Sequence, residues 1–182
     1  MKAMLHPLRL AVLLLLTTGF SGWSQGAIIW DGPIITFDHP DGVGASVADF
    51  LTPGVSFTRD ITQGLFNLTT EGAYSHFFSP QDTAWSYGSL ADYASLTYVT
   101  WEQWNGKHPP SMVGQPAVVH LIAENIYLSL TFTSWTMGPG GGFSYDRSTP
   151  PAVPEPAIGA LCGLSGLCAL AFTIRRTRMG RK

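Results

Sequence analysis

The eight residues Ile126-Tyr-Leu-Ser-Leu-Thr-Phe-Thr133 alternate strictly between apolar and polar side chains. Successive side chains of a strand point to opposite faces of a sheet, so one set of four is expected to face a core. The inward set is Ile126, Leu128, Leu130 and Phe132, and the outward set is Tyr127, Ser129, Thr131 and Thr133. A second apolar run, 117–123, comes just before, and Glu124-Asn125 predicts a tight connection between two strands.

Shorter segments of the same kind extend on both sides of this pair. The further predicted strands are Ile28–Trp30, Ile34–Phe37, Val55–Thr58, Gly64–Thr69, Leu96–Trp104 and Gly142–Tyr145. Glycine and proline mark the gaps between them, and no long amphipathic helix is visible. Many short strands separated by turn signals are typical of an all-β protein, so we expect one β-sandwich of the jelly-roll kind over residues 28–148.

The N-terminal residues 1–27 have the three parts of a secretory signal peptide. Lys2 and Arg9 provide positive charge, residues 10–16 form a short apolar core, and small residues follow in Ser24-Gln-Gly-Ala27. We therefore expect export, with cleavage after Gly26 or Ala27. An uncleaved anchor is the alternative, although the apolar core is short for a membrane span.

The C-terminal residues have a second, different pattern. Residues 149–156 form a proline-rich spacer, residues 157–174 carry no charge, and residues 175–182 are strongly basic. Eighteen helical residues measure about 27 Å, close to the thickness of the bilayer core, so 157–174 is a predicted transmembrane helix. The basic residues Arg175, Arg176 and Arg178 are expected to stay in the cytoplasm, which leaves the β-domain outside.

The order of these C-terminal parts resembles the PEP-CTERM sorting signal. The matching residues are Val153, Pro154, Glu155 and Pro156, followed by the apolar span and the basic cluster. The resemblance implies processing at the inner membrane by an exosortase, then release or transfer to the cell surface of a bacterium that makes extracellular polysaccharide. A plain C-terminal membrane anchor is the alternative.

Part of the β-rich region also resembles an uncharacterised domain that recurs in exported bacterial proteins with this kind of tail. The resemblance covers residues 60–150 and rests on short stretches such as Gly64-Leu-Phe-Asn67, Phe132-Thr-Ser-Trp135 and Gly141-Gly-Phe-Ser-Tyr145. It implies no activity.

The charge of the exported part limits its partners. Between Ile28 and Val153 three cationic and eleven anionic side chains leave a net charge of −8. Such a domain repels phosphate backbones, so nucleic acid is excluded as an expected partner. Cys162 and Cys168 lie in the apolar C-terminal span, so the β-domain is expected to fold without disulfides.

No motif commits the domain to catalysis or to a metal. His39, His76, His108 and His120 have no metal-site spacing, and Asp38-His-Pro-Asp-Gly42 lacks the ligand spacing of a calcium loop. A serine-hydrolase elbow is missing, and Glu71, Glu102 and Glu124 could form a glycosidase pair only if the fold brought two of them together. We expect no catalytic residues, no metal and no cofactor.

Aromatic residues are the most informative feature of the domain. Trp85, Trp101, Trp104 and Trp135 are candidates for stacking on sugar rings, although ordinary core packing is the alternative for each. Trp101 and Trp104 are three apart in a predicted strand, so they are expected on opposite faces.

These observations favour a non-catalytic cell-surface or matrix protein associated with extracellular polysaccharide. A secreted carbohydrate-active enzyme and a metal-binding surface module are the alternatives. The first would need two facing carboxylates, and the second would need histidines or the Asp38–Asp41 turn to converge with other ligands.

Overall fold

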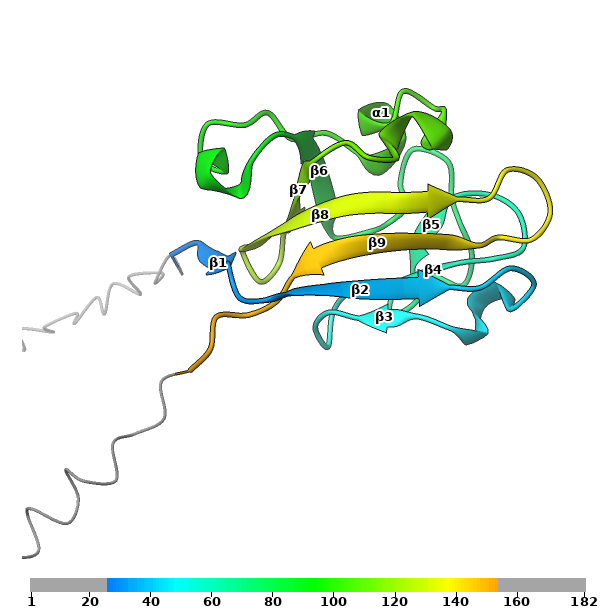
Figure 1. Cartoon of the computed structure of the whole chain (residues 1–182), viewed down its shortest axis with the longest axis horizontal. Coiled ribbons are helices and arrows are strands. Elements are labelled where there is room, and N and C mark those ends of the chain that lie inside the picture. The colour runs from blue at the N-terminus through cyan, green and yellow to red at the C-terminus, as the bar shows by residue number, and fades with distance from the viewer. Residues whose placement is uncertain (1–25, 154–182) are drawn as a thin grey trace, which may run out of the picture.

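The computed structural model describes residues 26–153, which form a β-rich sandwich (Figure 1). Nearly all of the predicted signal peptide, residues 154–156 of the sorting motif, the predicted transmembrane helix and the basic tail lie outside the described residues. Val153, the first residue of the motif, is described and strongly exposed. Within residues 26–153, no helix has both the length and the apolar character needed to cross a membrane.

The larger sheet has six strands and the smaller has three. The strands are β1 (Ile28–Trp30), β2 (Ile34–His39), β3 (Asp49–Phe50), β4 (Ser56–Arg59), β5 (Leu65–Asn67), β6 (Thr83–Tyr87), β7 (Ala117–Leu121), β8 (Ile126–Trp135) and β9 (Phe143–Ser148). The larger sheet has the order β2-β9-β8-β7-β6, with β1 pairing in parallel beside the start of β8, and the smaller has the order β3-β4-β5. All other pairings are antiparallel.

The helical segments are short. They are α1 (Trp101–Trp104) and the 3₁₀ turns η1 (Gly44–Ser46), η2 (Leu90–Asp92) and η3 (Pro109–Met112). The prediction of a β-rich sandwich is therefore confirmed for the part of the chain that the structure describes.

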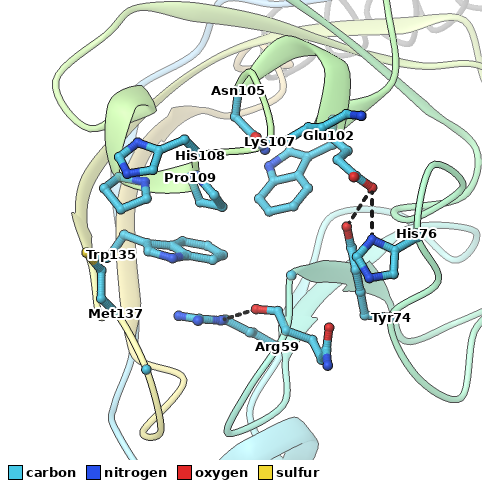
Figure 2. Close-up of a pocket in the computed structure, with 15 residues that line it drawn as sticks. Arg59, Tyr74, His76, Glu102, Asn105, Lys107, His108, Pro109, Trp135 and Met137 are labelled. Atoms are coloured by element: carbon cyan, nitrogen blue, oxygen red, sulfur yellow. Dashed lines mark hydrogen bonds and ion pairs between the residues drawn. The ribbon is translucent and has the colours of Figure 1, made fainter.

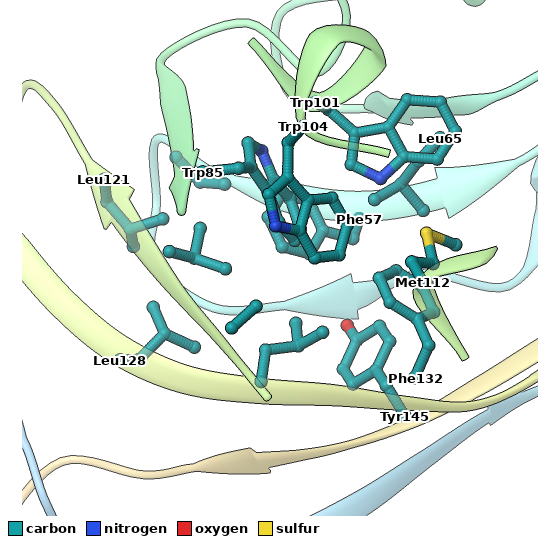
Figure 3. Close-up of a cluster of buried hydrophobic side chains, with 14 of the residues drawn as sticks. Phe57, Leu65, Trp85, Trp101, Trp104, Met112, Leu121, Leu128, Phe132 and Tyr145 are labelled. Atoms are coloured by element: carbon teal, nitrogen blue, oxygen red, sulfur yellow. The ribbon is translucent and has the colours of Figure 1, made fainter. Parts of the chain in front are cut away.

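The predicted alternation of β8 is present and supplies the centre of the core. Ile126, Leu128, Leu130 and Phe132 are all buried, and each of them belongs to the single hydrophobic cluster (Figure 3). The cluster reaches the small sheet through Phe57, whose ring centroid lies 5.5 Å from that of Trp85. Burial of this apolar surface is the main favourable term that joins the two sheets.

Both ends of the described chain lie at the same end of the sandwich. Ile28 pairs with Ile126 at the start of β8, and the Gly32 N–H donates to the Thr149 carbonyl at 2.9 Å. Figure 1 shows that the first and last coloured residues both lie at this end of the sandwich. The opposite end of β8 is Trp135, about 30 Å away along ten strand residues.

One predicted strand, Leu96–Trp104, is wrong. Only Val99 bridges to a strand residue, Trp85, and the chain then turns into α1. The Thr100 hydroxyl accepts the Gln103 N–H at 3.4 Å, and Thr-x-x-Gln is the spacing of a capping box. The prediction also omitted β6 and the two-residue strand β3.

Candidate functional site

A pocket of about 300 Å³, shown in close-up in Figure 2, lies at the end of the sandwich opposite the two ends of the described residues. Its wall comes from four segments: the β4–β5 hairpin, the loop at Tyr74 to His76, the stretch from α1 to η3, and the end of β8. Elements far apart in the sequence therefore meet here, which is why no local motif indicated the site.

A β-bulge brings Trp135 into this pocket. Strict alternation from Phe132 would put Trp135 on the outer face of β8. The pairing with β9 shifts between Phe132 and Ser134, so Trp135 pairs with Phe143 on the inner side. Its ring centroid consequently lies 6.0 Å from that of Phe132 and 5.6 Å from that of Trp101. Bulges commonly redirect a side chain in this way.

Gly64 allows two aromatic rings to close the pocket wall. A Cβ atom at this position would lie 2.5 Å from Cε2 of Tyr74 and 2.7 Å from Cζ3 of Trp101. The same two rings meet edge to face with centroids 6.2 Å apart. Any side chain larger than hydrogen would therefore displace one of the rings.

Arg59 is buried along one side of the pocket. Its guanidinium carbon lies 3.9 Å from the centroid of the Trp135 ring, which is a cation–π geometry. Nε donates to the Gln63 carbonyl at 2.9 Å, and Nη1 donates to the carbonyls of Thr136 and Gly142 at 3.0 and 3.3 Å. Burial lowers the pKa of Arg59 to about 10, and the charge of Asp41 opposes this only in part.

Glu102 lies on the opposite side of the pocket, where it accepts hydrogen bonds from a neighbouring loop. Its Oε2 accepts the Tyr74 hydroxyl at 2.9 Å and the Phe77 N–H at 2.8 Å, and it lies 3.5 Å from Nδ1 of His76. Burial alone raises the pKa of Glu102, but these hydrogen bonds outweigh it and hold the pKa below its ordinary value. The same arrangement raises the pKa of Tyr74, through burial first and then through Glu102. At neutral pH Glu102 is therefore an ionised carboxylate and Tyr74 is a neutral phenol.

Two buried polar side chains complete this wall. Trp101 and Asn105 both line the pocket and are almost fully buried. The indole Nε1 of Trp101 and both amide atoms of Asn105 have no hydrogen-bond partner among the described residues. Buried polar atoms are normally satisfied, so these unpaired atoms are exceptions behind the pocket wall.

The four predicted tryptophans have different environments. Trp85, Trp101 and Trp104 all belong to the buried core, where the rings of Trp85 and Trp104 lie 5.2 Å apart between centroids (Figure 3). Trp101 also lines the pocket, as does the half-buried Trp135. Of the four side chains, Trp135 has the largest exposed part, and the other three are buried. The expectation that Trp101 and Trp104 face opposite sides is also wrong, because α1 puts residues three apart on the same face.

Apart from His76 and His108, which line the pocket with Glu102, the histidine and carboxylate candidates lie in separate places. His39 is buried with Nε2 2.9 Å from the Gly44 carbonyl, and His120 stacks on Tyr127 with centroids 4.2 Å apart. Asp41 of the predicted turn accepts the Gly142 N–H at 2.8 Å. In residues 26–153 no three potential metal-ligating side chains come together.

The three glutamates also have separate roles. Glu71 accepts hydrogen bonds from the Asn67 and Gln81 N–H groups, and Glu124 accepts one from the Thr52 hydroxyl. Only Glu102 lines the pocket, together with His76 and His108.

Sequence reasoning missed Arg59, Asn105 and Lys107 as pocket residues. A signal was present for two of them, because Arg59 and Lys107 are two of only three cations between Ile28 and Val153. No family model, no curated protein and no solved structure matches this chain.

Proposed function

We propose that this chain is an exported, non-catalytic surface or matrix protein that is processed through a PEP-CTERM-type tail and binds extracellular polysaccharide in the pocket. The observation that carries the proposal is the combination of aromatic rings and hydrogen-bonding groups around one cavity. The rings are Trp135, Trp101 and Tyr74, and the polar groups are those of Arg59, Glu102 and His76.

This combination suits a sugar because a sugar ring is apolar on its faces and polar at its edge. Trp135 and Tyr74 are only partly buried, so their rings can contact a ligand in the cavity. Hydroxyl groups of the ligand would find acceptors and donors in Glu102 and His76. The volume of about 300 Å³ lies within the range of small-molecule pockets.

The direction of the pocket supports a surface role. Both ends of the described chain leave from the side of the sandwich where β8 begins, and the pocket lies where β8 ends. A domain tethered through its C-terminus would therefore present the pocket away from the membrane. The strand connectivity differs from the expected jelly roll, because β6 to β9 and β3 to β5 each pair with their neighbours in sequence.

The two alternatives have less support. A glycosidase that uses a carboxylate pair needs two carboxyl groups flanking one bond, and Glu102 is the single carboxylate among the described pocket residues. A metal-binding module would need ligands that converge, and residues 26–153 hold no such group. We therefore favour binding over hydrolysis or metal capture.

The sorting part of the proposal is tested by the mass and location of the mature protein in its native host. We expect a product that begins near Ile28, ends near Pro156 and is found outside the inner membrane. A product that keeps residues 157–182 and stays in the inner membrane would contradict exosortase processing and leave a plain anchor.

The binding part is tested by a pull-down of the full chain on polysaccharide from the same host. We expect retention by the native chain and loss of retention in Trp135→Ala, because the substitution removes a ring from the pocket. Phe50→Ala is the matched control, since Phe50 is an exposed aromatic on β3 that does not line the pocket. Equal retention of both variants would contradict binding in the pocket.

A further inference from the structure

Positive charge is concentrated at the pocket although the domain as a whole is acidic. Residues 28–153 contain three cationic side chains, Arg59, Lys107 and Arg147. Arg147 is held by Asp49, with Nε–Oδ2 and Nη2–Oδ1 distances of 2.6 and 2.8 Å. The other two cations, Arg59 and Lys107, both line the pocket. All of the cationic charge that the domain leaves without a salt bridge therefore borders one cavity.

The buried guanidinium of Arg59 is attracted by the charge of Asp41 but forms no ion pair with it. Among the described residues the ion pairs are His76–Glu102 and Arg147–Asp49. No carboxylate of these residues lies within 4.0 Å of the Arg59 guanidinium. Its hydrogen bonds engage Nε and Nη1 and go to carbonyl groups. Nη2 makes no hydrogen bond to the described residues, so it is the guanidinium nitrogen left to bind a ligand at the pocket.

Burying a charge without a counter-charge is unfavourable, and proteins normally pair such a group. An anion in the pocket would supply the missing partner, through a charge-assisted hydrogen bond to Nη2. Trp135 fixes the orientation of the guanidinium from one face, so the donor is already aligned before a ligand arrives.

We infer, on the basis of the proposed saccharide binding, that the pocket takes an acidic sugar whose carboxylate binds Arg59, with Lys107 adding positive charge at the same pocket. A singly charged group fits best, because Arg59 and Lys107 together carry two positive charges and Glu102 in the same pocket carries one negative charge. A doubly charged phosphate would exceed the single net positive charge of these three groups. The ligand class is therefore a uronic-acid saccharide.

The test is a binding titration of the full 182-residue chain in a polyoxyethylene detergent, whose headgroup carries no sugar. Tryptophan fluorescence reports binding, because Trp101 and Trp135 line the pocket. The probes are a galacturonic acid trisaccharide, its methyl ester and sodium acetate. The ester keeps the sugar rings and removes the charge, so we expect it to bind about tenfold more weakly than the acid.

Two variants assign the effect to the pocket cations. Arg59→Met should abolish the preference for the acid over the ester. Lys107 is exposed, so Lys107→Gln leaves the fold intact and should weaken acid binding about threefold, with Lys107→Arg restoring it. Asp92→Asn is the matched control: it changes one exposed charge outside the pocket and should leave the preference unchanged.

The outcomes separate this inference from the proposed function. Equal binding of acid and ester would overturn the inference and leave saccharide binding standing. Binding of acetate with no binding of either trisaccharide would support the anion site and contradict the saccharide proposal. Failure of all three probes would overturn both.

Discussion

The two buried arginines of this domain have opposite surroundings. Arg147 of β9 forms a two-point salt bridge with Asp49 of β3, and the Tyr145 hydroxyl donates to the same carboxylate at 2.8 Å. Arg59 of β4 donates only to backbone carbonyls and stacks on Trp135. Arg147 thus links the two sheets inside the sandwich, whereas Arg59 borders a cavity.

The pKa values of the two groups move in opposite directions. Burial by itself lowers the pKa of both. For Arg147 the hydrogen bonds and charge of Asp49 outweigh burial and raise the pKa, while Arg59 lacks such a partner and its pKa falls to about 10. The fold therefore pairs the Arg147 cation with Asp49 in the interior and leaves the Arg59 cation without a salt bridge at the pocket.

The largest expected effect comes from removing the partner of Arg147. Asp49→Ala leaves a buried guanidinium without its counter-charge, so we expect a loss of about 3–5 kcal/mol in the free energy of unfolding. Urea denaturation of the full chain measures this loss. The double variant Asp49→Ala/Arg147→Met should recover most of it, because the unpaired charge is also removed. A loss below about 1 kcal/mol in Asp49→Ala would show that the pair is not structural.

A smaller effect is expected from Arg59→Met, which keeps an unbranched apolar chain over Trp135. The backbone carbonyls lose their donor, at about 1–3 kcal/mol, but relief from burying an uncompensated charge offsets part of this. We expect a net loss of at most about 2 kcal/mol in the same denaturation experiment. If Arg59→Met were as destabilising as Asp49→Ala, Arg59 would have a structural role like that of Arg147, and the contrast between the two would be contradicted.

A pH-dependent effect is expected on the opposite wall of the pocket. The pKa of Glu102 in the folded chain lies below its ordinary value of 4.5 because of its hydrogen bonds. A depressed carboxyl pKa contributes stability that is complete above 4.5 and is lost as the pH falls through the folded value. The stability difference between the native chain and Glu102→Gln should therefore shrink below pH 4.5. A stability difference between the two chains that stays constant as the pH falls below 4.5 would contradict the lowered pKa of Glu102.

The smallest effect is expected for Lys107→Gln. The Lys107 ammonium lies 5.0 Å from the centroid of the exposed Phe77 ring, and neither group is part of the core. We expect a change of less than about 0.5 kcal/mol in the free energy of unfolding. Thermal unfolding monitored by circular dichroism checks this. A change of several kcal/mol would give Lys107 a structural role and would make its binding effect indirect.

The sequence prediction succeeded where a structural feature depends only on residues that are neighbours in the sequence. The alternation of Ile126 to Phe132 predicted β8 and its buried face because the period of a strand is a property of the backbone. The same rule failed at Trp101 to Trp104, where the Thr100 cap and the spacing to Gln103 favoured a helical turn. The strand prediction failed there because it used the period of a strand and did not consider the helix cap at Thr100.

The pocket was much harder to predict. The β-bulge between Phe132 and Ser134 turns Trp135 inward, and nothing in the alternation of β8 indicates where the register shifts. The contact between Gly64, Tyr74 and Trp101 joins three separate segments, so no spacing in the sequence reports it.

The sequence by itself determined the β-rich class, the inward face of β8 and the acidic balance of the exported region, because each depends on composition or on neighbouring residues. The tertiary structure alone decided which of the scarce cations is neutralised and which two meet at a cavity. The physical reason is that pairing of charges and exposure of rings depend on distances between segments, and these distances exist only once the two sheets have packed.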